Sequence, residues 1–133
     1  MPCDERYRAW ARRRKPEGTD PPPPELRHAV LTGAGPCPAR AGFRELRFDV
    51  GGMPWSWCFP GSATRDDQDD PVLPAQIRAV VLRPGPHGLA AEAVLNQQAD
   101  HQPAKLSPAA VAELALAEVP VLVHSSLLPR VSV

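Results

Sequence analysis

The chain has 133 residues, with 15 basic and 15 acidic side chains and a formal net charge of zero at pH 7. This length fits one domain of ordinary size and is too short for two independent cores. The charge balance argues against a protein coated with basic residues for nucleic-acid binding, so local clusters of charge are more informative than the total.

The cysteines and the hydropathy pattern exclude several further classes. Three cysteines, Cys3, Cys37 and Cys58, are an odd number without close spacing and do not indicate a disulfide framework. Because no Cys-x-x-Cys or His-x-x-x-His pair is present, we expect no structural zinc site and no cofactor. No apolar stretch approaches the roughly 20 residues that span a bilayer, and none follows the N-terminus as in a secretory signal. We therefore predict a cytoplasmic protein with reduced thiols and no membrane association.

Residues 1–15 are predicted to form a basic helical arm. Tyr7 and Trp10 fall on one face of this helix, and basic side chains occupy most of the remainder. A helix this short is marginal alone, so packing of the two aromatic rings would have to hold it. Residues 16–25 include four consecutive prolines and predict a stiff, proline-rich linker. We place the single domain at 26–133.

The clearest local pattern is that of a β-hairpin. Large apolar side chains alternate with polar ones on both sides of Gly51–Gly52, and paired glycines suit the positive φ angles of a tight turn. With these glycines as the loop, Phe48 lies opposite Trp55 and Leu46 opposite Trp57. All the large apolar side chains then share one face of the hairpin.

The segments that follow the hairpin differ in character. Residues 60–74 are acidic, bounded by prolines and without an apolar period, which predicts an exposed loop. A nearly continuous apolar run near 77–83 predicts a central strand. The alanines of residues 89–98 favour a helix, whereas the alternation of apolar residues in the same segment favours a strand. We favour the strand, because a short turn before it would make a second hairpin.

The best helix signal covers residues 107–118. Ser107 suits the N-cap, and Pro108 suits the first helical position. A short apolar strand near 120–124 follows, and this close succession of helix and strand suggests a parallel return to the sheet.

Together these elements predict an α+β fold. It consists of a small, mostly antiparallel sheet of three to five strands with one helix packed on a face. The sheet comprises the hairpin 43–59 and the strands near 77–83 and 120–124. The expected core residues are Leu46, Phe48, Val50, Trp55, Trp57, Ile77, Val81, Val111, Leu114, Leu122 and Val123.

Two kinds of residue invite a chemical hypothesis. Cys58 becomes a candidate nucleophile if a histidine such as His101 or His124 activates it, although a thiol in a strand is commonly an ordinary packing residue. The acidic run at 66–70 lacks the glycine and distal glutamate of a calcium loop, so we expect no metal site there.

The basic arm supplies the expected binding surface. Its aromatic and cationic side chains suit phosphates and stacked bases, and they equally suit an acidic protein surface. These residues are Tyr7, Trp10, Arg12, Arg13 and Arg14. Because segments of opposite charge flank a neutral core, the leading hypothesis is a non-enzymatic accessory or protein-binding module, with a protein partner or a second copy. The alternatives are a small cysteine-dependent enzyme using Cys58 with a histidine, and nucleic-acid binding through the arm.

Overall fold

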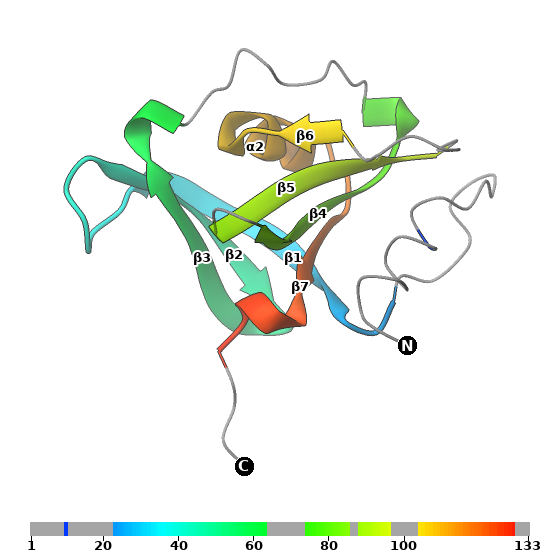
Figure 1. The fold of residues 1–133 in the computed structure, drawn as a ribbon, viewed down its shortest axis with the longest axis horizontal. Coiled ribbons are helices and arrows are strands. Elements are labelled where there is room, and N and C mark those ends of the chain that lie inside the picture. Colours follow the sequence, from blue (N-terminus) through cyan, green and yellow to red (C-terminus); the bar gives the residue numbers. More distant parts are fainter. Residues whose placement is uncertain (1–9, 11–22, 64–73, 86–87, 97–103, 130–133) are drawn as a thin grey trace.

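A single curled sheet dominates the computed structural model, which describes residues 10, 23–63, 74–85, 88–96 and 104–129 (Figure 1). Its seven strands have the order β3-β2-β1-β7-β4-β5-β6. The strands are β1 (Leu26–Pro36), β2 (Phe43–Val50), β3 (Met53–Pro60), β4 (Ile77–Gly85), β5 (Gly88–Leu95), β6 (Ala104–Leu106) and β7 (Val121–His124). The helical elements are α2 (Pro108–Leu116) and the short 3₁₀ helices η2 (Gly61–Ala63), η3 (Pro74–Gln76) and η4 (Ser125–Leu127).

The predicted fold class is wrong in the size and the pairing of the sheet. Instead of a small, mostly antiparallel sheet, the structure has seven strands in a mixed sheet. β7 lies in its middle, antiparallel to β1 and parallel to β4, where Val80 pairs with Val121. The sequence does not predict β1, because its Gly33–Gly35 stretch consists of small residues with low strand propensity. β6 is missed because it has only three residues.

The β2–β3 hairpin has the predicted register. Phe48 lies opposite Trp55, and Leu46 lies opposite Trp57. Both glycines of the turn have positive φ angles, which explains why this turn needs residues without a side chain. The Phe48 and Trp55 rings are tilted at 40°, with centroids 5.8 Å apart.

Two other local predictions are confirmed. The ambiguous segment after Gly88 is a strand, β5, and pairs antiparallel with β4. The helix begins after Ser107, whose Oγ accepts a hydrogen bond from the Ala110 N–H at 3.3 Å. Pro108 stands at the start of the helix, where its missing N–H costs no hydrogen bond.

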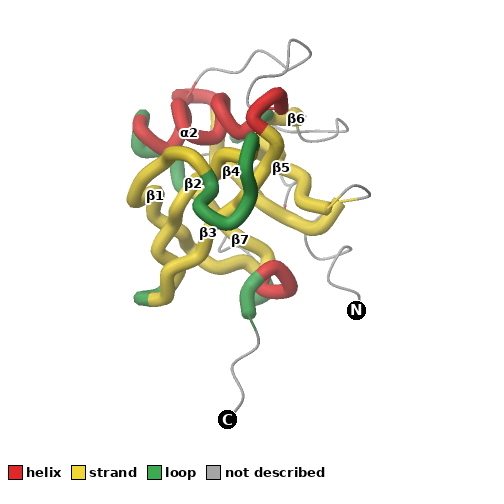
Figure 2. The backbone as a smooth tube through the Cα atoms, turned by 90° about the vertical axis from the view of Figure 1, so that its left-hand side faces the viewer, coloured by secondary structure: helices red, strands yellow, loops and turns green. Residues whose placement is uncertain are grey.

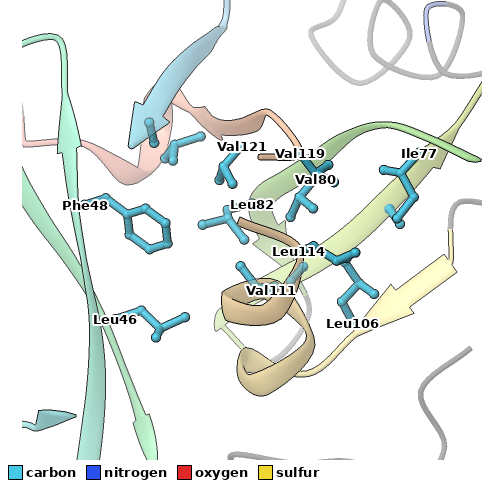
Figure 3. Packing of buried hydrophobic residues seen from close by; sticks show 14 of the residues in the cluster. Leu46, Phe48, Ile77, Val80, Leu82, Leu106, Val111, Leu114, Val119 and Val121 are labelled. Atoms are coloured by element: carbon cyan, nitrogen blue, oxygen red, sulfur yellow. The ribbon is translucent and has the colours of Figure 1, made fainter. Parts of the chain in front are cut away.

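The strands curl toward α2 (Figure 2), and the main core packs between the sheet and this helix (Figure 3). Phe48 of β2 faces Leu82 of β4, and Val111 and Leu114 of α2 close the same space. Of the predicted core residues, only Trp55 and Trp57 are half-buried, and the others are buried.

A second, smaller cluster lies on the other side of β4 and β7. It contains Val81 and Leu122, which alternate along their strands with residues of the main core. Trp10 covers this cluster and is 4% exposed. The Arg78 guanidinium lies 5.1 Å from the centre of the Trp10 ring and donates to the Trp10 carbonyl at 2.9 Å. Trp10 of the predicted arm thus packs against the sheet.

None of the helices in the described part of the chain is long and apolar enough to cross a bilayer. The predicted acidic loop at 66–70 lies outside the described residues.

Candidate functional site

An open cleft of about 670 Å³ lies between β3 and β5. Its walls are Trp57–Pro60 of β3, Gly88–Glu92 of β5 and Lys105–Pro108, which run from the end of β6 into the start of α2. Because consecutive residues of β3 line the cleft, both faces of that strand contribute, and the cleft therefore runs along the strand's edge. β3 ends the sheet order, and β6 pairs with β5 only at Ala91–Ala93. Within the described residues, both walls thus include strand backbone without a neighbouring strand on the cleft side.

The two prolines of β3 indicate which backbone groups face this cleft. Along an antiparallel strand, successive residues direct their N–H and C=O groups alternately toward and away from the neighbour. Proline has no N–H and in a sheet occupies positions where that side of the backbone faces away from the ladder. Pro54 and Pro60 are both paired within the β2–β3 ladder, so we assign them to the outward set. The alternation assigns Ser56 and Cys58 to the same set, with N–H groups directed at the open edge.

The aromatic side chains of β3 divide between the cleft and the C-terminal part of the chain. Trp57 packs edge-on against Phe59, with ring centroids 5.3 Å apart, and both line the cleft. Trp55 instead donates its Nε1–H to the Leu127 carbonyl at 3.1 Å. Trp57 is half-buried whereas Phe59 is buried, so Trp57 is the more accessible of the two rings to a ligand in the cleft.

Charged side chains lie on the opposite wall. Glu92 of β5 and Lys105 of β6 are paired across their ladder and both line the cleft. A carboxylate oxygen of Glu92 also lies 3.8 Å from the Arg83 guanidinium. The cleft thus combines an apolar wall on β3 with a wall that carries both signs of charge.

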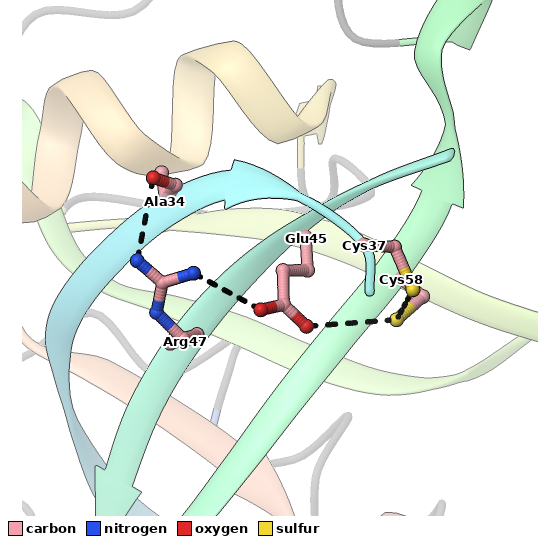
Figure 4. A network of polar contacts seen from close by, with 5 residues as sticks. All are labelled: Ala34, Cys37, Glu45, Arg47 and Cys58. Carbon is pink, nitrogen blue, oxygen red and sulfur yellow. Dashed lines mark hydrogen bonds and ion pairs between the residues drawn. The ribbon is translucent and has the colours of Figure 1, made fainter. Parts of the chain in front are cut away.

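A second cluster of polar groups lies on the polar face of the hairpin (Figure 4). Cys58 lies opposite Glu45 in the β2–β3 ladder, and its Sγ is 3.9 Å from Glu45 Oε2. The Sγ of Cys37, just after β1, is 3.1 Å from the Sγ of Cys58. Cys37 and Glu45 are each 7% exposed, whereas Cys58 is exposed. We call Cys37, Glu45 and Cys58 the thiol–carboxylate cluster.

The turn between β1 and β2 positions Cys37. Its N–H donates to the Phe43 carbonyl at 2.9 Å, which closes the turn. The turn also needs Gly42, whose φ is +80°. The Arg40 guanidinium lies 4.0 Å from the centre of the Phe43 ring and covers the base of the turn.

Arg47 holds the Glu45 carboxylate. Its Nη1 donates to Glu45 Oε1 at 3.0 Å, and its Nη2 donates to the Ala34 carbonyl at 3.4 Å. The guanidinium lies across β1 at Gly33, where an added Cβ would stand 2.7 Å from Nη2. The glycine thus leaves room for Arg47, and Glu45 keeps its other oxygen directed at Cys58.

The two thiols differ in pKa. A hydrogen bond between the sulfurs raises the pKa of Cys58 to about 11, with added contributions from burial and from the negative charges of Cys37 and Glu45. The same hydrogen bond lowers the pKa of Cys37, and the backbone groups of Ala39 and Arg40 lower it further. In the reduced protein, Cys37 is therefore the first of the pair to ionise.

The structure does not bring Cys58 and His124 together. His124 pairs with Leu26 at one end of β1, whereas Gly35, near the other end, pairs with Glu45, the cross-strand partner of Cys58. At about 3.3 Å per residue, these two positions on β1 are roughly 30 Å apart along the strand. A Cys58–His124 catalytic pair therefore has no geometric support.

The remaining predicted site residues fall into two groups. Trp10 is buried in the smaller cluster against Arg78. The others lie outside the described residues: His101, Tyr7, Arg12, Arg13 and Arg14.

Sequence reasoning missed Cys37 and Glu45. The signal for Glu45 was available, since the register that sets Phe48 opposite Trp55 also sets Glu45 opposite Cys58. No comparable signal exists for Cys37, because its place beside Cys58 depends on the pairing of β1 with β2.

No protein-family model matches this chain, and neither the curated proteins nor the solved structures include a significant match.

Proposed function

We propose that this domain is a non-enzymatic protein-binding module that accepts an extended segment of a partner protein along the open edge of β3. The observation that carries the proposal is the edge itself. Ser56 and Cys58 are assigned N–H groups directed away from β2, and no described strand lies beside them. In recognition by strand addition, hydrogen bonds to such main-chain groups give affinity, and pockets for alternate side chains give specificity.

The two prolines of β3 favour the binding of one short segment over pairing along the whole strand edge. An exposed strand edge is a template for aggregation, and proline is one of the residues that blunt it. Pro54 and Pro60 lie on either side of the window at Ser56 and Cys58. Such an edge accepts a short segment and resists pairing along its whole length.

The cleft supports a particular kind of ligand. A strand added to β3 would place alternate side chains next to Trp57, in the space between β3 and β5. The opposite wall offers Glu92 and Lys105 to polar groups of the ligand. We therefore propose a short extended peptide with a large apolar residue at the position that faces Trp57.

The proposal includes the compartment and the class of partner. We place the module in the cytoplasm, where cysteine thiols stay reduced. We choose a protein over a nucleic acid because strand addition needs a polypeptide backbone. The alternatives of a cysteine enzyme and a nucleic-acid binder draw no support from the described residues.

A displayed library of random peptides, selected on the full chain, tests the proposal. Selected peptides are then synthesised, and their dissociation constants are measured for the wild type, for Ser56→Pro and for Ser56→Ala. Proline removes the outward N–H, whereas alanine keeps it and removes only the hydroxyl. We expect affinity to fall by about tenfold or more in Ser56→Pro, because one main-chain hydrogen bond is lost and the ring obstructs the edge. Ser56→Ala should bind as the wild type does.

The outcomes are distinct. Equal affinity of the selected peptides for wild type and Ser56→Pro would refute strand addition at β3. A library that yields no binder, while the cleft takes up small apolar molecules, would refute a peptide ligand. Thermal unfolding of both variants serves as the control for folding.

A further inference from the structure

The thiol–carboxylate cluster brings three metal-ligating side chains to one point. The ligand atoms of Cys37, Glu45 and Cys58 all lie within 4.8 Å of one another. They come from three separate segments: the turn after β1, strand β2 and strand β3. A cluster assembled in this way depends on the tertiary fold.

The negative charge of the cluster favours the binding of a cation. Glu45 is a buried carboxylate whose Oε2 lies 3.9 Å from the Cys58 Sγ, and the Cys37 Sγ lies 3.1 Å from the same sulfur. A divalent ion would bind all three groups as anions, because metal-bound thiols are deprotonated. The two charges of the ion and the one of Arg47 would balance two thiolates and one carboxylate. The complete site would then be electrically neutral, which suits its partial burial.

The presence of the carboxylate favours a bound ion over a disulfide in this cluster. Two thiolates on one tetrahedral zinc ion, with bonds of about 2.3 Å, would have their sulfurs about 3.8 Å apart. A disulfide needs about 2.05 Å. The observed separation of 3.1 Å lies between these values, so it does not decide alone. The carboxylate decides, because a disulfide would use two of the three groups and leave Glu45 beside an uncharged bridge.

We propose that Cys37, Glu45 and Cys58 form a binding site for a thiophilic divalent metal ion, Zn²⁺, whose fourth position is open to solvent on the side of Cys58. Arg47 is a positioning residue in this site. Its hydrogen bond to Glu45 Oε1 orients the carboxylate and leaves Oε2 for the ion, as hydrogen bonds to metal-bound carboxylates commonly do. Binding replaces the two S–H bonds with two S–Zn bonds and releases the thiol protons to solvent. The site lies on the polar face of the hairpin and does not depend on the proposed function.

The test is a zinc titration of the full chain, reduced with a phosphine and kept free of oxygen. A chromophoric chelator competes for the ion and reports the dissociation constant and the stoichiometry. Co²⁺ replaces Zn²⁺ in a second titration, because thiolate-to-cobalt charge-transfer absorption reports sulfur ligation directly. We expect one ion per chain and a clear charge-transfer band.

Four variants identify the ligands. Cys37→Ser and Cys58→Ser should each weaken zinc binding by about a hundredfold or more, since each removes a thiolate ligand. Glu45→Gln should weaken it by about tenfold or more. Cys3→Ser is the matched control and should bind as the wild type does. Since serine at buried position 37 can impair folding, Glu45→Gln, which alters no cysteine, gives a second measure at the site.

Several results would overturn the proposal. These are binding well below one ion per chain, a cobalt complex without the charge-transfer band, or a Cys58→Ser variant that binds zinc as tightly as the wild type. A reduced protein that binds no zinc, but closes a Cys37–Cys58 disulfide under mild oxidation, would identify the cluster as a redox pair instead.

Discussion

Pro54 and Pro60 stand six residues apart on β3, and the alternation of the strand assigns both of them backbone nitrogens directed away from β2. Their even spacing matches the alternation of a strand, so one open edge explains both prolines. Ser56 and Cys58 lie between the two prolines and have the same orientation in the strand. Unlike proline, each of them carries a backbone N–H group. This relationship connects the sequence of β3 to the proposed binding edge.

The first prediction concerns a third proline in this strand. Ser56→Pro should leave the free energy of unfolding almost unchanged, because the lost N–H does not belong to the β2–β3 ladder. Ala93→Pro is the control, since Ala93 lies in β5 between Val80 and Ala104 and is paired on both sides. That variant should lose about 3 kcal/mol of stability or more. Chemical denaturation of both proteins checks the prediction, and similar losses would show that the Ser56 N–H faces β2.

The second prediction concerns the main core. Phe48 is 1% exposed and packs against Trp55, so Phe48→Ala should lower the free energy of unfolding by about 3–5 kcal/mol. Val30→Ala is the matched control, because Val30 is 64% exposed. Its effect should stay within about 0.5 kcal/mol. Urea denaturation measures both values. A small loss for Phe48→Ala would mean that β2 does not contribute its inner face to the core.

The hairpin was predictable because its signals are local. Alternation, the glycine pair and the aromatic pairs fix the register of Phe48 opposite Trp55 without any knowledge of the remaining fold. The position of β7 was not predictable, since pairing with both β1 and β4 depends on contacts between segments distant in sequence. The same holds for the thiol–carboxylate cluster. The register gives Glu45 beside Cys58, but only the fold brings Cys37 to them.

A third prediction tests the role of Gly33. In Gly33→Ala the new Cβ would come within 2.7 Å of Arg47 Nη2 and would displace the guanidinium from Glu45. Stability should change by less than about 1 kcal/mol, because the Arg47–Glu45 pair is partly exposed. Zinc affinity should fall by about tenfold. Gly35→Ala is the matched control, since its Cβ would meet Arg47 only at 3.7 Å. Equal zinc affinity in both variants would contradict a positioning role for Arg47.

The fourth prediction concerns the thiols of the metal-free protein. The pKa of Cys58 is raised to about 11 from an ordinary value of 9.0, chiefly by its hydrogen bond with Cys37. Removing the partner in Cys37→Ala should lower the pKa of Cys58 toward 9.0. At pH 9, Cys58 should then react with iodoacetamide several-fold faster than in the wild type, because the larger thiolate fraction outweighs the lower nucleophilicity of a thiolate with a lower pKa. Mass mapping of the Cys58 peptide measures the rate at this site. Equal rates in the two proteins would contradict the assigned hydrogen bond.

Amide hydrogen exchange of the full chain with a library-selected peptide reports directly on strand addition at β3. The Ser56 and Cys58 N–H groups should exchange quickly in the protein alone and become protected when the peptide binds. Protection confined to these two residues of β3, with the Trp57 amide already protected by β2 before binding, would support it. Unchanged exchange at Ser56 and Cys58 in the saturated complex would contradict it.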